Sequence, residues 1–121
     1  MTWTNNKSMI LSVNFSDRSM VRSILLRGGY GPRFACGFYC NGGGCDTYLF
    51  AIFIVQANGG SGITLKELPQ VVWSANRNHP IKENATLELT RDGDLVLKDV
   101  DNTVVWSSNT SRKSVVGLNL T

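Results

Sequence analysis

The segment "TLELTRDGDLVLKD", residues 86–99, places side chains of different chemistry at every second position. Alternate residues of a β-strand point to the same face of a sheet, so a hairpin would gather these side chains on one surface. They offer a hydroxyl, two carboxylates, an isopropyl group and an ammonium group: Thr90, Asp92, Asp94, Val96 and Lys98. The pattern predicts a hairpin with one face available to a ligand.

The register of this hairpin follows from its leucines. A two-residue turn at Asp92-Gly93 would pair Leu89 with Val96 and mix apolar and polar side chains on both faces. A three-residue tip, Asp92-Gly93-Asp94, separates them, and we predict it for that reason. Four leucines then face the core, namely Leu87, Leu89, Leu95 and Leu97, and the opposite face carries Glu88, Thr90, Val96 and Lys98.

Catalytic and metal-binding patterns are absent from the sequence. The single histidine, His79, lies in the Asn/Pro-rich segment "NRNHPIK", where we expect an exposed side chain rather than a general base. The carboxylate pairs Asp92/Asp94 and Asp99/Asp101 fit turn chemistry. The glycine clusters match no phosphate-binding pattern, and "DGDLVLKDVDN" lacks calcium-loop spacing. The sequence predicts no enzyme, no cofactor and no metal.

Composition indicates one ordered domain over residues 1–121. Hydrophobic residues make up 42% of the chain, and the net charge is +3. The basic residues are scattered, which argues against nucleic-acid binding. The longest apolar run, "YLFAIFIV" at residues 48–55, is far shorter than the roughly 20 residues that a membrane span needs. It predicts a buried strand and no membrane contact within this chain.

Three cysteines lie close together in "RFACGFYCNGGGCDTYLF". Cys40 and Cys45 flank the turn "NGGG", which lets two adjacent strands approach to disulfide distance, so we predict this pair. Cys36 is then an odd thiol, either buried or paired with something outside the chain. A zinc site lacks a fourth ligand.

Five N-x-S/T sequons in 121 residues favour a secreted glycoprotein. The candidate glycosylation sites are Asn6, Asn14, Asn84, Asn109 and Asn119.

An internal repeat organises the second half of the chain. "VVWSAN" at 71–76 recurs as "VVWSSN" at 104–109, and "TLELT" at 86–90 recurs as "GLNLT" at 117–121. We expect the equivalent tryptophans, Trp73 and Trp106, to fill the core of each unit. The third unit is cut short at Thr121, so we expect the edge around residues 115–121 to be poorly closed or paired with another chain.

The motifs "VVWSANRNHPI", "LELTRDGDLVLKD" and "VVWSSNTS" together resemble the plant bulb-type, mannose-binding lectin domain. The upstream segments "WTNNKSMILSVNFSDRSMVRSILLRG" and "GPRFACGFYCNGGGCDTYLFAIFIV" look like the form found in S-locus-glycoprotein-like proteins and G-type lectin receptor-like kinases. This resemblance implies an all-β fold, a β-prism of three antiparallel sheets with pseudo-threefold symmetry. It also implies secretion or display outside the cell.

The sugar motif of that family is Q-x-D-x-N-x-V-x-Y, and its positions fall on Thr90, Asp92, Asp94, Val96 and Lys98. Only Asp92 and Val96 match. Thr90 is shorter than Gln, Asp94 exchanges an amide donor for an acceptor, and Lys98 removes a phenol. Each lost hydrogen bond is worth about 0.5–1.5 kcal/mol. We therefore expect binding of mannose-type glycans to be weak or lost.

The sequence thus predicts a non-enzymatic, extracellular recognition module of a receptor-like kinase or secreted glycoprotein. If the chain is a fragment, a kinase domain would lie downstream. The alternative is a module that binds a protein or peptide, or that forms a homodimer, and binds no sugar.

Overall fold

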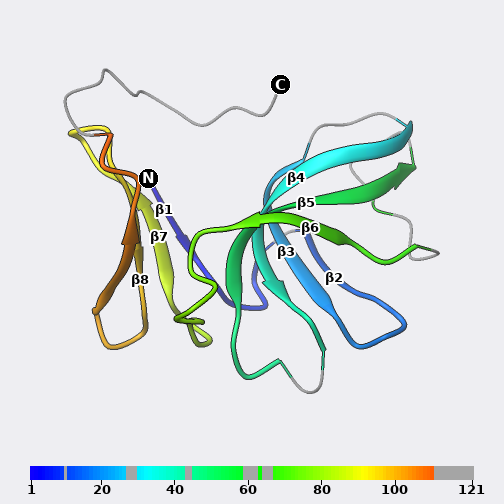
Figure 1. Cartoon of the computed structure of the whole chain (residues 1–121), viewed down its shortest axis with the longest axis horizontal. Coiled ribbons are helices and arrows are strands. Elements are labelled where there is room, and N and C mark those ends of the chain that lie inside the picture. The colour runs from blue at the N-terminus through cyan, green and yellow to red at the C-terminus, as the bar shows by residue number, and fades with distance from the viewer. Residues whose placement is uncertain (10, 27–29, 43–44, 59–62, 64–66, 111–121) are drawn as a thin grey trace.

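The computed structural model describes residues 1–9, 11–26, 30–42, 45–58, 63 and 67–110, which contain strands and no helix. Two antiparallel sheets lie side by side, and β1 at the start of the chain lies against β7 (Figure 1). The four-stranded sheet has the order β1 (Thr2–Thr4), β7 (Thr86–Leu89), β8 (Leu95–Lys98) and β9 (Val104–Ser107). The five-stranded sheet has the order β2 (Leu11–Asn14), β3 (Met20–Leu26), β4 (Tyr30–Cys40), β5 (Leu49–Asn58) and β6 (Gln70–Ser74).

The all-β expectation is confirmed, and two antiparallel sheets are consistent with a bulb-type lectin prism. Residues 111–121, which include the end of the unit cut short at Thr121 and the edge expected around 115–121, lie outside the described residues. The assignment of residues 1–121 to one domain stays a prediction.

The strand expected from "YLFAIFIV" is confirmed as β5, and both of its faces are buried. Phe50 points into a core that lies between the two sheets and includes Phe38, Leu87 and Leu97. Phe53 points into a second core on the opposite face of the five-stranded sheet, with Phe15, Val21, Ala35, Ala51, Val55 and Ile63. A strand covered on both faces needs a continuous apolar run instead of alternation, which explains the composition of this segment.

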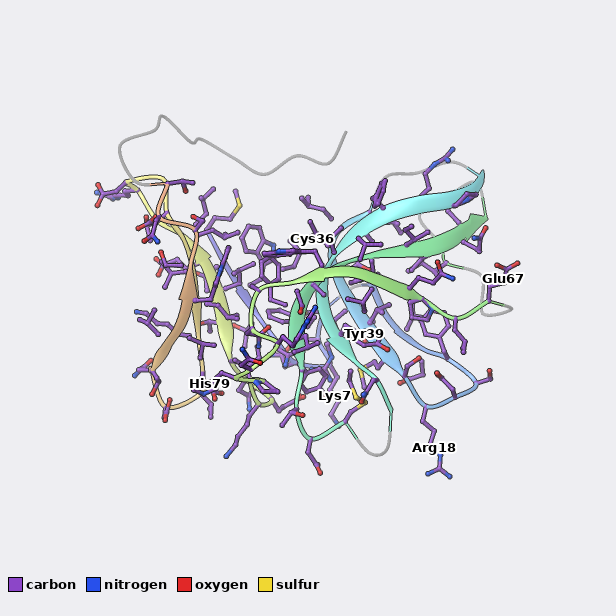
Figure 2. The ribbon with its side chains drawn as sticks, viewed as in Figure 1. Lys7, Arg18, Cys36, Tyr39, Glu67 and His79 are labelled. Carbon is purple, nitrogen blue, oxygen red and sulfur yellow. A yellow bond between two sulfur atoms is a disulfide. The ribbon has the colours of Figure 1, made fainter. Side chains whose placement is uncertain are left out.

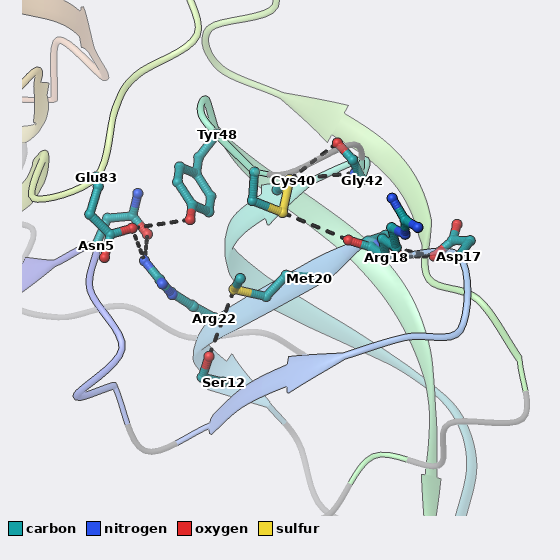
Figure 3. Close-up of a disulfide and its surroundings, with 12 residues drawn as sticks. Asn5, Ser12, Asp17, Arg18, Met20, Arg22, Cys40, Gly42, Tyr48 and Glu83 are labelled. Atoms are coloured by element: carbon teal, nitrogen blue, oxygen red, sulfur yellow. Dashed lines mark hydrogen bonds and ion pairs between the residues drawn. A yellow bond between two sulfur atoms is a disulfide. The ribbon is translucent and has the colours of Figure 1, made fainter.

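The sheets are joined by a buried arginine on β3. The Arg22 side chain is 4% exposed, and its Nη1 donates to Asn5 Oδ1 and to Glu83 Oε1, each at 2.8 Å. Tyr48 donates its hydroxyl to the same Glu83 oxygen at 3.0 Å, and the Arg22 guanidinium lies 5.1 Å from the Tyr48 ring centre (Figure 3). Asn5 follows β1 and Glu83 precedes β7, so this cluster fastens the four-stranded sheet to the five-stranded one.

The hairpin of β7 and β8 has the predicted faces but a different tip. Leu89 pairs with Leu95 and Leu87 with Leu97, and the leucine face is directed to the core. Gly93 N–H donates to Thr90 O at 3.1 Å and Thr90 N–H to Asp94 O at 2.8 Å, so the three-residue tip is Arg91-Asp92-Gly93, one residue earlier than predicted. Gly93 has φ of 88°, which suits glycine at the end of such a tip. The pairing moves by two residues, so the faces are unchanged.

The prediction that both repeat tryptophans are buried is wrong for Trp73. Its side chain is 43% exposed, whereas Trp106 is half-buried. The ring centres of Trp73 and Trp106 lie 5.8 Å apart. The ring centre of Phe50 lies 6.3 Å from that of Trp73 and 5.9 Å from that of Trp106. Trp73 lies on β6, the edge strand of its sheet, so one side of the indole has no neighbouring strand to cover it.

The ion pair at the sheet junction makes stability depend on pH. Burial alone would raise the pKa of Glu83, but hydrogen bonds from Arg22 and Tyr48 and the charge of Arg22 hold it below its usual 4.5. A carboxyl whose pKa is lower in the folded state stabilises the fold fully above pH 4.5, and this contribution is lost as the pH falls through the lowered pKa.

We predict that Glu83→Gln lowers the free energy of unfolding at pH 7 by about 1 kcal/mol, since the Glu83 side chain is 40% exposed and solvent screens the pair. The difference from the wild type should shrink below pH 4.5. Urea unfolding at pH 7 and at acidic pH measures both. Glu88→Gln, on the outer face of β7, is the control and should have little effect. Equal stability of Glu83→Gln and wild type at pH 7 would contradict the role of the pair.

Candidate functional site

The outer face of the β7–β8 hairpin carries the side chains that the sequence selected. Thr90, Val96 and Lys98 are half-buried, Asp92 is exposed at the tip, and all lie opposite the leucine face. Val96 pairs with Glu88 on one side and with Ser107 of β9 on the other. The local alternation of the strands therefore brings the predicted set to one surface.

Two members of this set are engaged within the hairpin. Thr90 Oγ1 accepts a hydrogen bond from the Asp94 backbone N–H at 3.1 Å. Asp94 Oδ1 accepts one from the Thr110 backbone N–H at 2.7 Å. These side chains stabilise the tip and the segment after β9, which reduces what they can offer to a ligand.

The segment after β9 was missed by sequence reasoning, although it lies against the hairpin tip. The Thr110 hydroxyl donates to Gly93 O and shares a hydrogen bond with Ser108 Oγ, and Leu95 N–H donates to Ser108 Oγ at 2.9 Å. The repeat could have indicated this segment, because the copy here ends in "SSNT" whereas the earlier copy ends in "SANR".

The remaining groups of the hairpin face can supply only simple contacts. Asp92 has no hydrogen-bond partner among the described residues and offers an exposed carboxylate, which accepts hydrogen bonds but does not donate them. Val96 adds a small apolar surface and Lys98 an ammonium group. Such a face can hold a hydroxyl-bearing ligand weakly, and it contains no nucleophile–base pair.

The other carboxylates behave as the turn interpretation predicted. Asp99 Oδ1 accepts hydrogen bonds from Lys82 N–H at 3.0 Å and Val100 N–H at 2.8 Å. Asp101 Oδ1 accepts one from Thr103 N–H at 3.0 Å, and the side-chain and backbone hydrogen bonds of Thr103 lower the pKa of Asp101. Within the described part of the chain no cluster of His, Cys, Asp and Glu could hold a metal ion. His79 is exposed, as expected (Figure 2).

The predicted disulfide Cys40–Cys45 is confirmed, with Cα atoms 5.5 Å apart. Cys36 lies on β4 as a free thiol that is 7% exposed, so the buried alternative holds in this structure. Burial raises the pKa of the Cys36 thiol to about 12. A thiol of this kind is protonated at neutral pH and reacts slowly.

The sequons differ in their exposure. Asn14, Asn84 and Asn109 are exposed, and Asn6 is half-buried, with its Oδ1 accepting from Ser8 N–H at 3.0 Å. Asn119 lies outside the described residues.

Comparison with known proteins places the hairpin in a family. Residues 70–119, which contain β6 to β9, match the family model described as D-mannose binding lectin. The resemblance to bulb-type lectins drawn from the sequence is confirmed over these residues.

The similar proteins come from plants. EP1-like glycoprotein 4 of Arabidopsis thaliana is 55% identical over 49 residues, which are 40% of this chain and 11% of that protein. A G-type lectin S-receptor-like serine/threonine-protein kinase of the same plant is 46% identical over 70 residues, 58% of this chain and 7% of that protein.

The epidermis-specific secreted glycoprotein EP1 of Daucus carota is 46% identical over 55 residues, 46% of this chain and 14% of that protein. The chain therefore spans only a small fraction of the length of the curated relatives it matches. No solved structure gives a significant match. In the described residues we find no helix that could span a membrane.

We predict that Cys36 resists alkylation by iodoacetamide at pH 7.5 in the folded protein and reacts fully in urea, because its thiol is buried and protonated. Mass spectrometry after timed quenching measures the modification. Cys36→Ser, whose disulfide is intact, is the control and should stay unmodified in both conditions. Rapid modification of the native protein, or a dimer on non-reducing gels that Cys36→Ser removes, would contradict the prediction.

Proposed function

We propose that this chain is a non-enzymatic, extracellular recognition module of the bulb-type lectin kind, with a degenerate mannose site on the β7–β8 hairpin. The family match over residues 70–119 supports the lectin class. The disulfide and the exposed sequons suit an oxidising secretory route. Relatives named as a secreted glycoprotein and as a receptor-like kinase support a position outside the cell, free or as a receptor ectodomain.

One observation carries the loss of sugar affinity. Thr90 and Asp94, which stand where the family motif has Gln and Asn, hydrogen-bond to backbone groups of their own hairpin and of the following segment. Asp94 supplies no donor, and Lys98 replaces the tyrosine hydroxyl of the motif. The hairpin thus keeps the scaffold of a mannose site and lacks the amide and phenol donors of the family motif.

A second candidate function is binding of a protein or peptide, or formation of a homodimer. It is favoured by large apolar side chains exposed on the edge strands β6 and β9, namely Val71, Val72, Trp73 and Val104. Exposed apolar patches and open strand edges commonly mark association surfaces. Light scattering after size-exclusion chromatography distinguishes a dimer from a monomer.

We predict that restoring the motif restores sugar binding. The triple variant Thr90→Gln, Asp94→Asn, Lys98→Tyr should bind mannose and oligomannose measurably by calorimetry, whereas the wild type binds them weakly or not at all. Asn at position 94 keeps the oxygen that accepts the Thr110 N–H, so the tip should remain folded.

Adding Asp92→Ala to the triple variant is the matched control and should remove the gained binding. Strong mannose binding by the wild type that Asp92→Ala abolishes would show that the native site is functional. Mannose binding that is unaffected by any of these changes would refute a site on this hairpin.

We also predict that secretion from a eukaryotic host yields a glycosylated chain, with occupancy greatest at the exposed Asn14, Asn84 and Asn109. Peptide mapping after enzymatic deglycosylation identifies the modified positions. Each Asn→Gln variant should lose one glycan from the intact mass. Absence of glycan at all three positions would contradict the extracellular proposal.

A further inference from the structure

The five-stranded sheet carries a cleft that is separate from the hairpin. Two adjoining hollows of about 230 and 320 Å³ open near the ends of β4, β5 and β6, and they share Tyr39, Asn41, Leu49 and Arg77. Thr47 and Pro80 also line the first hollow, and Val71 and Ser74 the second. Figure 2 marks Tyr39 on this sheet.

The floor of the cleft is apolar and held in place from below. The Tyr39 and Leu49 side chains are half-buried and pack on the second core, where the Tyr39 ring centre lies 6.5 Å from that of Phe53. Burial, and then the charge of Asp17, raise the pKa of Tyr39, so its phenol stays neutral. An aromatic ring beside a leucine suits the apolar face of a sugar ring.

The rim of the cleft carries exposed polar side chains. Asn41, Thr47 and Arg77 are exposed, and none of their side chains has a hydrogen-bond partner within the described residues. Among the described residues, Arg77 is the one charged residue that lines either hollow. Tyr48 also lines the first hollow. The carboxylates that act electrostatically on Tyr39 and Tyr48 are Asp17, Asp46 and Glu83, and none of them lines either hollow. The lining therefore favours a ligand with a negative charge.

The rim residues are positioned by covalent and buried contacts. Asn41 directly follows Cys40 and Thr47 lies two residues after Cys45, so the disulfide holds the two ends of this loop together (Figure 3). Arg77 follows the buried Asn76, whose Oδ1 accepts from Phe50 N–H at 2.9 Å and whose Nδ2 donates to Tyr48 O at 3.3 Å and to His79 O at 3.1 Å. These contacts hold the backbone that carries the rim residues.

We infer that this cleft binds an acidic saccharide. The Arg77 guanidinium would pair with a uronate carboxylate, the Tyr39 ring would contact the face of the sugar, and Asn41 and Thr47 would hydrogen-bond its hydroxyls. A neutral sugar would leave Arg77 without a partner, and a flexible acidic peptide would make little use of the flat apolar floor. The inference is independent of mannose binding at the hairpin, which involves the other sheet.

The test is a titration of the full 121-residue chain with trigalacturonate, followed by NMR or calorimetry. The control ligand is the fully methyl-esterified trisaccharide, which keeps the rings and hydroxyls but has no charge. We expect trigalacturonate to bind and the ester to bind at least about tenfold more weakly, because a charge-assisted bidentate contact is lost.

Arg77→Gln should reduce trigalacturonate affinity by about tenfold or more. Arg91→Gln is the matched control, since it removes an exposed arginine from the hairpin tip on the other sheet, and it should leave affinity unchanged. Tyr39→Leu keeps an apolar floor and removes the ring, and it should also weaken binding. Circular dichroism and unfolding curves confirm that each variant is folded.

Several results would overturn the inference. They are absence of trigalacturonate binding, equal binding of the methyl ester, or wild-type affinity in Arg77→Gln. An equal loss of affinity in Arg91→Gln would also overturn it, because that result would indicate attraction to net charge alone. Equal binding of a glutamate peptide of the same charge would assign the cleft to acidic peptides and also refute it. Mannose titration of the hairpin variants tests the lectin proposal separately, so failure of the acidic-saccharide inference can be distinguished from failure of that proposal.

Discussion

The ion pair of the buried Arg22 with the half-exposed Glu83 is the contact on which the arrangement of the two sheets depends. A guanidinium in an apolar interior is costly unless it is paired and hydrogen-bonded. Asn5, Glu83 and the Tyr48 ring supply those partners from three separate parts of the chain. Because these residues lie next to β1, β7 and β5, the pairing fixes how the hairpin sheet meets the larger one.

Side-chain hydrogen bonds to the backbone stabilise both candidate binding surfaces. At the hairpin, the Thr90 and Asp94 side-chain oxygens accept backbone hydrogen bonds and stabilise the tip. At the cleft, the buried Asn76 side chain also bonds to the backbone, next to the exposed Arg77. The same kind of bond therefore stabilises the backbone at both surfaces.

The two copies of the "VVWS" motif show how a sequence repeat acquires different environments. Both form the last strand of a sheet, and their tryptophans meet edge to face above Phe50. Trp106 is half-buried and Trp73 is 43% exposed. An identical local sequence gives the same strand and the same inward direction. Its burial depends on which segments cover it.

The sequence by itself determined the features that depend on neighbouring residues. Alternation placed the leucines of the hairpin on one face, the Gly-rich turn brought Cys40 to Cys45, and a continuous apolar run made β5 a strand buried on both sides. The position of the hairpin tip depends on the conformation of Gly93 and was predicted one residue too late. The leucine and polar faces were still predicted correctly, because the strand pairing differs by two residues. Only the tertiary structure decided that Arg22 meets Glu83, that Thr110 bonds to Asp94, and that Tyr39 and Arg77 line one cleft. Those contacts join distant segments, and their distances are set by the packing of whole sheets, which local periodicity does not encode.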